Sequence, residues 1–373
     1  MDFNYSDLQR MLVDSAERYI AERFTLEHRR SLRDSDNGAD SGLDAKAWAT
    51  FAELGWLAVA VPEELGGLGG SQADVAVLAA ALGNKCVSQP FVGTAVEGVH
   101  LLAAATQPRT DLIEQIVGGA ARVALVHGEP GERYAGAAPR QTTLAVEGAG
   151  YVLSGQKFFA PDGPLATHLV VSAQLAGTGL ALVLVEAGAA GITADAYPLL
   201  DGSRAADLRF DAVPVAAEAV LASGAAAEEL LLAAQDRAAL ARLAQAVGSM
   251  EEVLKICSAY LKERQQFGQP IGKFQALQHI MADMFVATHQ SRSALYQALA
   301  NAERPTAERA RAISLAAITI GEASQLVARQ GVQLHGGYGV TDEYEISHHY
   351  RYLLTLEKIA GDLDFHMRRV AAA

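Results

Sequence analysis

The sequence contains little cysteine and no long apolar run. Its 373 residues include two cysteines, Cys86 and Cys257, which are too few for a disulfide framework. Each is therefore expected to be a small buried apolar residue. No uninterrupted run of about 18 apolar residues is present, so no membrane span is expected. The first residues, MDFNYSDLQR, lack the apolar run of a signal peptide, which favours a cytoplasmic protein.

Positive charge is also scarce. The sequence has 30 Lys and Arg against 43 Asp and Glu, which gives a formal net charge of −13. A protein that binds nucleic acid needs a basic face to neutralise phosphates, so this charge balance argues against that class. Half of the residues are hydrophobic and 20% are charged, so a large core is expected rather than disorder.

Proline is nearly absent from the last part of the chain. Beyond residue 220 only Pro270 and Pro305 occur, and because proline is excluded from helix interiors, this region can be almost entirely helical. Helical periodicity predicts four long helices with short connections, which is the pattern of an antiparallel four-helix bundle. The predicted helices cover 225–264, 274–301, 306–334 and 347–371.

The first 220 residues have two different patterns. Ser6 and Gln9 form a capping box at the start of a predicted first helix. Further helices are predicted over 44–55, 71–85, 92–106 and 109–118. Short apolar runs separated by turns then predict a β-sandwich or barrel, with strands over 121–127, 143–148, 151–159, 167–173, 180–187, 191–197 and 206–211.

These patterns predict an α+β fold with three domains. The expected domains are an N-terminal helical domain over 1–119, a middle β-domain over 120–222 and a C-terminal four-helix bundle over 223–373. A chain of this length commonly holds two or three domains, at about 150 residues each.

Most chemical motifs are absent. The glycines at 66–70 lack the spacing of a dinucleotide fingerprint. Asp362, Asp364 and His366 cannot share one helix face, so no metal site is expected. His348 and His349 lack the spacing of a zinc protease motif and are expected at an exposed helix start. The residues by themselves reveal neither a nucleophile nor a metal.

Two blocks near the C-terminus resemble the acyl-CoA dehydrogenase family closely: YLKERQQFGQPIGKFQALQHIMADM (260–284) and ARQGVQLHGGYGVTDEYEISHHYR (328–351). The loop at 54–70 and the strand at 151–159 resemble the same family, in the same order. The resemblance implies a helical domain, a β-domain and a four-helix bundle. It also implies oxidation of an acyl-CoA substrate to the 2,3-enoyl thioester, with a carboxylate base, FAD and an electron-transfer acceptor.

In this family the flavin lies across two subunits, and one of them contacts the pyrophosphate and adenine. By the resemblance, Arg264 would pair with the pyrophosphate, and Phe267 would pack beside the adenosine. Gln275, Gln333 and the Gly336–Gly337 pair match the remaining motif positions. An arginine fork suits a phosphate, and glycines allow the backbone to approach it closely.

The catalytic base of the family is missing. The glutamate of the family's Glu-Gly pair falls on Ala360, which is followed by Gly361. Some members place the base on the first bundle helix, at the position of Ala238. No catalytic residue is therefore predicted in this chain.

Further departures lie on the side of the flavin ring. The family's Trp-x-Thr segment, whose Thr faces the ring, reads Phe159-Ala160-Pro161 here. The family's Thr-Glu-Pro turn reads Gly128-Glu129-Pro130. The Thr and Gln that follow the base, and contact the phosphate and ribitol region, read Asp362 and Asp364. These losses are confined to the side of the base and flavin ring. The motif by which a chain of this family contacts the pyrophosphate and adenine of its neighbour's flavin is complete here.

This asymmetry resembles the base-less small subunit of heteromeric bacterial acyl-CoA dehydrogenases that act on dicarboxylyl-CoA or steroid-derived CoA substrates. The hypothesis implies a homologous catalytic subunit as partner, in an α2β2 hetero-oligomer. One alternative is a self-sufficient FAD enzyme with a relocated base. Glu357 and Asp362 are the candidates, and they are otherwise expected on a polar helix face and at the N-cap of the final helix. The other alternative is a flavin-free scaffold that binds only a partner or a CoA thioester.

Overall fold

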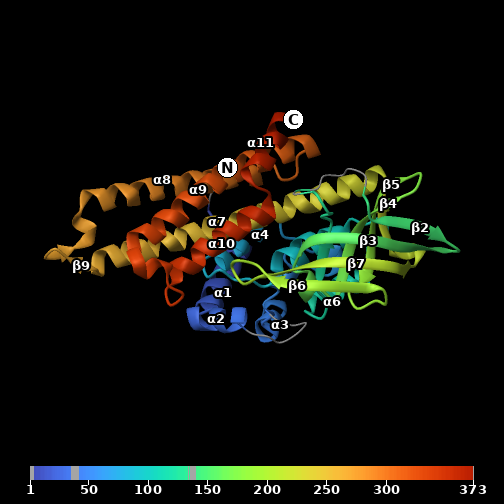
Figure 1. Cartoon of the computed structure of the whole chain (residues 1–373), viewed down its shortest axis with the longest axis horizontal. Coiled ribbons are helices and arrows are strands. Elements are labelled where there is room, and N and C mark those ends of the chain that lie inside the picture. The colour runs from blue at the N-terminus through green and yellow to red at the C-terminus, as the bar shows by residue number, and fades with distance from the viewer. Residues whose placement is uncertain (1–3, 35–41, 133, 135–139, 373) are drawn as a thin grey trace. The chain divides into compact units, whose positions relative to one another are not determined.

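The computed structural model describes residues 4–34, 42–132, 134 and 140–372 (Figure 1). Contacts divide them into two compact units. The helical unit comprises the described residues of 1–31, 72–87 and 239–373, and the sheet unit those of 32–71 and 88–238. Each unit combines segments that are distant in the sequence. The boundaries of the three domains inferred from the sequence stay predictions.

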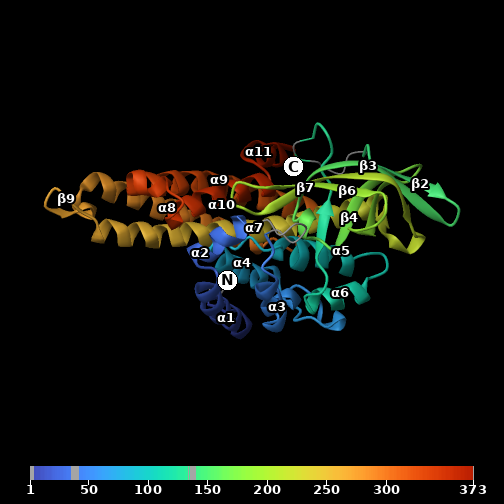
Figure 2. The same cartoon turned by 60° about the horizontal axis from the view of Figure 1, so that its bottom comes forward.

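The helical unit contains the long C-terminal helices and helices from the N-terminal region. Its helices are α1 (Asp7–Arg23), most of α2 (Leu26–Asp34), α4 (Gln72–Gly83), the C-terminal part of α7 (Ala225–Glu263), α8 (Gln275–Leu299), α9 (Thr306–His335), α10 (Glu345–Ala360) and α11 (Leu363–Ala372). Helices α8 and α9 lie side by side in both views (Figures 1 and 2). None of the helices in the described ranges combines the length and apolar character needed to cross a membrane.

The predicted helix over 347–371 is wrong in one respect, because it consists of two helices. α10 ends at Ala360, and Gly361 has a φ of 105°, which a glycine adopts readily. Asp362 then accepts a hydrogen bond from the N–H of Phe365 at 3.0 Å, and it thereby caps α11. The capping role expected for Asp362 is confirmed.

Other local expectations agree with the structure. The N–H of Gln9 donates to Ser6 Oγ at 3.1 Å, and the N–H of Ser6 donates to Gln9 Oε1 at 3.1 Å, so the capping box is confirmed. Cys86 and Cys257 are both buried and form no disulfide within the described residues, and burial raises the pKa of the Cys257 thiol to about 12.

Helices α4 and α7 approach each other until their backbones touch. A β-carbon on Gly83 would lie 2.0 Å from the carbonyl oxygen of Gln245, and one on Gly248 would lie 2.0 Å from that of Ala80. Only glycine fits at these two positions, so they fix how the N-terminal helices pack on the bundle.

The sheet unit contains three short helices, a π-helical segment and a mixed sheet. The helices are α3 (Ala45–Glu53), α5 (Val99–Ala103) and α6 (Thr110–Val117), with the π-helical segment Val92–Gly98 before α5. The strands are β1 (Val123–Val126), β2 (Thr143–Glu147), β3 (Gly150–Pro161), β4 (His168–Leu175), β5 (Gly179–Glu186), β6 (Ile192–Pro198), β7 (Arg204–Val215) and β8 (Val220–Ser223).

Within the described residues these eight strands form one sheet in the order β6-β7-β3-β2-β4-β5-β8, with β1 pairing in parallel with β4. All seven predicted strands are present, and β8 was missed. The expected sequence of helical, β and helical regions is confirmed.

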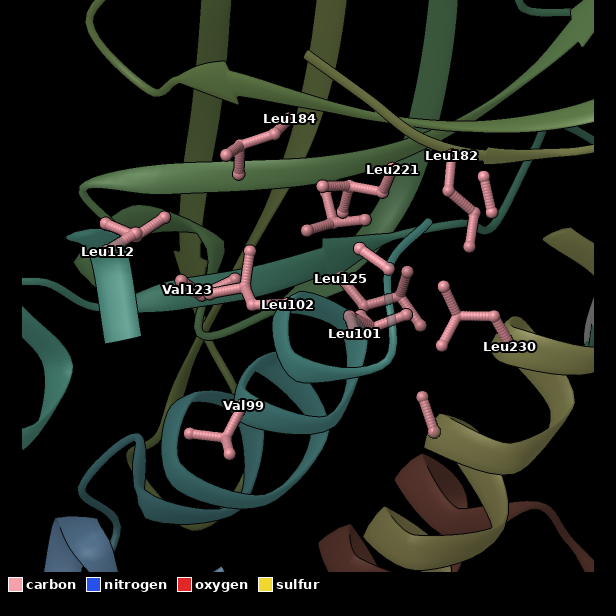
Figure 3. Close-up of a cluster of buried hydrophobic side chains, with 14 of the residues drawn as sticks. Val99, Leu101, Leu102, Leu112, Val123, Leu125, Leu182, Leu184, Leu221 and Leu230 are labelled. Carbon is pink, nitrogen blue, oxygen red and sulfur yellow. The ribbon is translucent and has the colours of Figure 1, made fainter. Parts of the chain in front are cut away.

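Both faces of this sheet are buried around β1 and β5. One face meets side chains of α5, α6 and the first turns of α7, as Figure 3 shows. On β1, Val123 and Leu125 enter this cluster, whereas Ala124 and Val126 enter a second cluster on the opposite face. Successive strand residues point to opposite faces, so burial of both faces explains the unbroken apolar runs. The labelled members of the first cluster are Val99, Leu101, Leu102, Leu112, Val123, Leu125, Leu182, Leu184, Leu221 and Leu230.

A buried ion pair fixes the segment after β1 against β3. Lys157 Nζ lies 2.8 Å from Glu129 Oε1, and the two side chains are 0% and 1% exposed. The same ammonium donates to Ser172 Oγ at 2.9 Å and to the carbonyl of His127 at 3.2 Å. All three donors of the ammonium are therefore used, as a buried charge requires.

Burial affects the two partners differently. It lowers the pKa of Lys157 to about 8, against the opposing effect of Glu129. Burial alone would raise the pKa of Glu129, but hydrogen bonds from Lys157 and from the N–H groups of Gln141 and Thr142 outweigh it, so this pKa is lowered. The carboxylate stays ionised in the folded chain.

We expect Glu129→Gln to lower the free energy of unfolding by about 3–5 kcal/mol in mildly acidic solution, because it leaves a buried ammonium without its counter-ion. Without Glu129 the pKa of Lys157 falls below 8, so folded Lys157 loses its proton earlier in the variant than in the parent. The deficit should therefore shrink as the pH rises toward 8. Urea unfolding of the parent and the variant at pH 5.5 and 8.5 measures this difference in the free energy of unfolding. A difference that grows with pH would contradict this account.

Candidate functional site

The first part of the candidate site is the hairpin that joins α7 to α8. Its strands are β9 (Gln265–Gln266) and β10 (Gln269–Pro270). At its tip Phe267 and Gly268 have φ values of 55° and 77°, the type I′ arrangement in which an aromatic residue is strained. Phe267 is nevertheless 86% exposed, with its ring edge-on to Phe274 at 5.9 Å. The strained turn thus presents an aromatic ring to the outside.

Arg264 lies at the base of this hairpin. Its N–H donates to the carbonyl of Tyr260 at 2.9 Å, and its own carbonyl accepts from the N–H of Ile271 at 2.9 Å. Both ends of the hairpin therefore fix the Arg264 backbone, while the residue as a whole is exposed.

The second part is the turn after α9, a short 3₁₀ helix, η8 (Gly336–Val340). Apart from the adjoining backbone and chain neighbours, no described atom lies within 4 Å of the place where a β-carbon of Gly336 or Gly337 would be. The N–H of Gly336 donates to the carbonyl of Gln333, so Gly336 offers open space rather than a free donor. Gly339 differs, since its β-carbon would lie 2.7 Å from the carbonyl oxygen of Val332.

An aromatic cluster connects the two parts. The ring centroids of Tyr260 and His335 are 4.2 Å apart, those of His335 and Tyr344 4.9 Å, and those of Tyr344 and Tyr338 4.4 Å. Tyr260 accepts the Arg264 N–H, and His335 directly precedes Gly336. The cluster therefore connects the base of the hairpin to the turn at Gly336–Val340, called the glycine turn below.

His335 is neutral at the centre of this cluster. Burial lowers its pKa, and Nδ1 lies 2.8 Å from the carbonyl oxygen of Gly331. The Nδ1–H group donates this bond, which fixes the orientation of the ring.

The other predicted cofactor residues are also exposed. Gln275 begins α8, and Gln333 lies in the last turn of α9. All six residues that are predicted to contact the cofactor are exposed to solvent: Arg264, Phe267, Gln275, Gln333, Gly336 and Gly337.

The predicted base positions hold no ionisable group. Ala238 is 0% exposed in α7. Ala360 ends α10, and its carbonyl accepts from His366 Nε2 at 3.0 Å, while His366 Nδ1 lies 3.2 Å from Ser314 Oγ. A β-carbon on the adjacent Gly361 would lie 2.8 Å from His366 Nε2. The buried His366 therefore lies against the backbone of residues 360 and 361.

The two candidates for a relocated base have other partners. The Glu357 side chain is expected on a polar helix face; it has polar partners there, but it is only 6% exposed. Its carboxylate accepts from Gln325 Nε2 at 3.1 and 3.2 Å and from Lys358 Nζ at 2.9 Å. Asp362 is buried and caps α11.

The altered positions on the β-domain are closely packed. A β-carbon on Gly128 would lie 2.5 Å from the carbonyl oxygen of Phe158, whose N–H donates to Gly128 at 2.9 Å. Phe159 has a φ of 53°, and its N–H donates to Asp207 Oδ1 at 3.0 Å. Packing against β3 thus explains the glycine at 128. No local sequence pattern pointed to Asp207, because its partner is distant along the chain.

The expectation that His348 and His349 are exposed is wrong. Both lie near the start of α10, and they are 9% and 0% exposed. His349 Nδ1 lies 2.8 Å from Ser249 Oγ and 3.3 Å from Cys86 Sγ, and burial lowers its pKa far below the usual value. The neighbouring helices cover this start of α10, which the local sequence does not reveal.

Two family models match the chain. The acyl-CoA dehydrogenase N-terminal domain matches residues 6–108, and the acyl-CoA dehydrogenase C-terminal domain matches residues 213–373. Among curated proteins, the chain is 31% identical over 315 residues to acyl-CoA dehydrogenase IpdE2 of Mycobacterium tuberculosis, covering 83% of this chain and 80% of that protein.

Solved structures give the same result. The ChsE4-ChsE5 complex from Mycobacterium tuberculosis contains a chain with a TM-score of 0.88 and 26% identity, covering 100% of this chain and 98% of that one. A variant of the Tcur3481-Tcur3483 steroid ACAD gives a TM-score of 0.87 and 30% identity, covering 98% of this chain and 96% of that one. With the two C-terminal motifs, the glycine turn and the helix–sheet–helix order, these matches establish that the chain belongs to the acyl-CoA dehydrogenase family.

Proposed function

We propose that this chain is the non-catalytic subunit of a heteromeric, FAD-dependent acyl-CoA dehydrogenase. It contributes adenine and pyrophosphate contacts to the FAD of a homologous catalytic subunit, in an α2β2 assembly that desaturates an acyl-CoA thioester at the 2,3-position. One observation carries the proposal. The six predicted contact residues are all exposed, while alanines occupy both predicted base positions.

The chemistry of the exposed residues fits one end of an FAD molecule. The Arg264 guanidinium can form two parallel hydrogen bonds with a pyrophosphate. The open backbone at Gly336 and Gly337 admits an anion closely, and the exposed Phe267 ring offers an apolar flank for the adenosine. When bound, FAD would supply the hydride acceptor of the reaction.

The same chain does not supply the rest of an active site. Proline at 161 provides neither a hydroxyl nor an N–H group, and a hydroxyl-bearing residue at 128 would require β3 to shift. Glu357 and Asp362 are committed to Gln325, Lys358 and the cap of α11. These contacts support a role without proton abstraction.

The relatives support the kind of partner and substrate. The ChsE4-ChsE5 complex and the Tcur3481-Tcur3483 steroid enzyme each combine two named proteins. We infer that this chain likewise assembles with a homologous catalytic subunit. The complex would act on a steroid-derived or related acyl-CoA substrate and pass electrons to an electron-transfer acceptor.

The proposal predicts that Arg264→Ala lowers the FAD content of the co-purified complex although Arg264 lies on the inactive subunit. Loss of a desolvated arginine–phosphate pair typically costs about 2–5 kcal/mol, and Arg264→Lys should recover only part of it. The flavin-to-protein ratio measures the effect. Lys273→Ala is a matched control, since Lys273 is also an exposed cation beside the hairpin. An unchanged ratio in Arg264→Ala would remove the main support for a shared site.

A second prediction concerns the base position. Ala360→Glu should give no dehydrogenase turnover in the isolated chain. A general base contributes about 10²–10⁴-fold, but only beside a bound flavin. The close packing at Gly128 and the missing hydroxyl and N–H groups at Pro161 still oppose binding. Turnover of any acyl-CoA by this single variant would show that the chain has a complete flavin site.

A further inference from the structure

A cluster of charged side chains surrounds Asp342, two residues after the glycine turn ends. The Asp342 carboxylate accepts from Arg351 Nη2 at 2.6 Å and pairs with Arg30 Nε at 3.1 Å. His348 Nε2 lies 3.0 Å from the main-chain oxygen of Asp342. Burial lowers the pKa of His348 to about 4, so near neutral pH the imidazole is uncharged and its Nε2–H donates to that oxygen. Both the side chain and the backbone of Asp342 are therefore held.

These partners come from opposite ends of the chain. Arg30 lies on α2, and Arg351 on α10. The preceding residue, Arg29, is buried, and it donates to the carbonyl of Lys85 at 3.1 Å and to Glu345 Oε1 at 3.4 Å. These bonds hold helix α2 against the start of α10, and they thereby fix the backbone from which the Arg30 side chain extends.

The glycine turn consequently has an anchor at each end. On one side His335 is enclosed by the aromatic cluster and bound to Gly331. On the other side Asp342 is bound by Arg30 and Arg351. Between them Thr341 Oγ1 donates to the carbonyl of Tyr338 at 2.9 Å.

We propose that Arg30 and Arg351, acting through Asp342, are positioning residues that hold the Gly336–Gly337 turn in the conformation that binds the phosphate of the partner's FAD. The inference rests on the proposed function. Its physical basis is preorganisation: a glycine turn without anchors loses conformational freedom when it binds an anion, and two fixed ends remove most of that cost. Supporting residues of this kind commonly affect affinity without touching the ligand.

The test uses the complex with the homologous catalytic subunit, stripped of flavin and titrated with FAD. Arg30→Ala and Arg351→Met should each raise the dissociation constant for FAD about tenfold. The kcat at saturating FAD should stay within about twofold of the parent, because the reacting groups are unchanged. Arg351→Lys should restore part of the affinity, since an ammonium can still pair with Asp342. A role in folding alone would not produce this separation of affinity from kcat.

Arg292→Ala is a matched control. Arg292 pairs with Glu251 at 3.3 Å, and its side chain is 40% exposed, against 38% for Arg30. It should leave FAD affinity unchanged, and an equal loss in Arg292→Ala and Arg30→Ala would overturn the inference. If the Arg351→Met subunit does not assemble with its partner, the FAD affinity of Arg30→Ala alone tests the inference, because the Arg30 side chain is more exposed than that of Arg351.

The two levels of the account can fail separately. Parent-like affinity in Arg30→Ala and Arg351→Met, together with FAD loss in Arg264→Ala, would refute the positioning role and leave the shared site standing. Parent-like affinity in Arg264→Ala as well would refute the shared site itself.

Discussion

The stacking of Tyr260, His335 and Tyr344 is the contact on which the candidate site depends. It joins the end of α7, where Arg264 begins the hairpin, to the turn that contains Gly336 and Gly337. A charge on this buried imidazole would be costly without a counter-charge. Burial lowers the pKa of His335, and the carbonyl of Gly331 fixes its tautomer. Two motifs that are far apart in the sequence thereby form one surface.

The described residues show two contrasting kinds of local environment. Around the cofactor motifs the backbone is open and the side chains are exposed, including an aromatic ring on a strained turn. At Gly361, next to the predicted base position, and at Gly128, a neighbouring side chain or strand lies where a β-carbon would have to fit. The contrast is consistent with a subunit that contributes to a cofactor site without completing one of its own.

The sequence predicted features that local rules determine. The capping box at Ser6, the strand alternation and the helix cap at Asp362 each depend on residues a few positions apart. Prediction from the sequence failed where contacts between residues distant along the chain determine the structure. Helix α2 was missed because its sequence is almost entirely polar, and its buried residue is Arg29. The burial of His348 and His349, and the links from Arg30 to Asp342, involve partners that are distant in the sequence or on other helices. The six cofactor positions were identified by family resemblance, and their exposure could only be seen in the structure.

The amount of flavin per chain tests the central claim most directly. The account predicts that the chain purified alone carries almost no FAD, and that the complex with its homologous catalytic subunit carries one FAD for every two chains. Absorbance of the flavin against protein concentration, measured on both preparations, gives the two ratios. A ratio near one FAD per chain in the isolated protein would contradict the account.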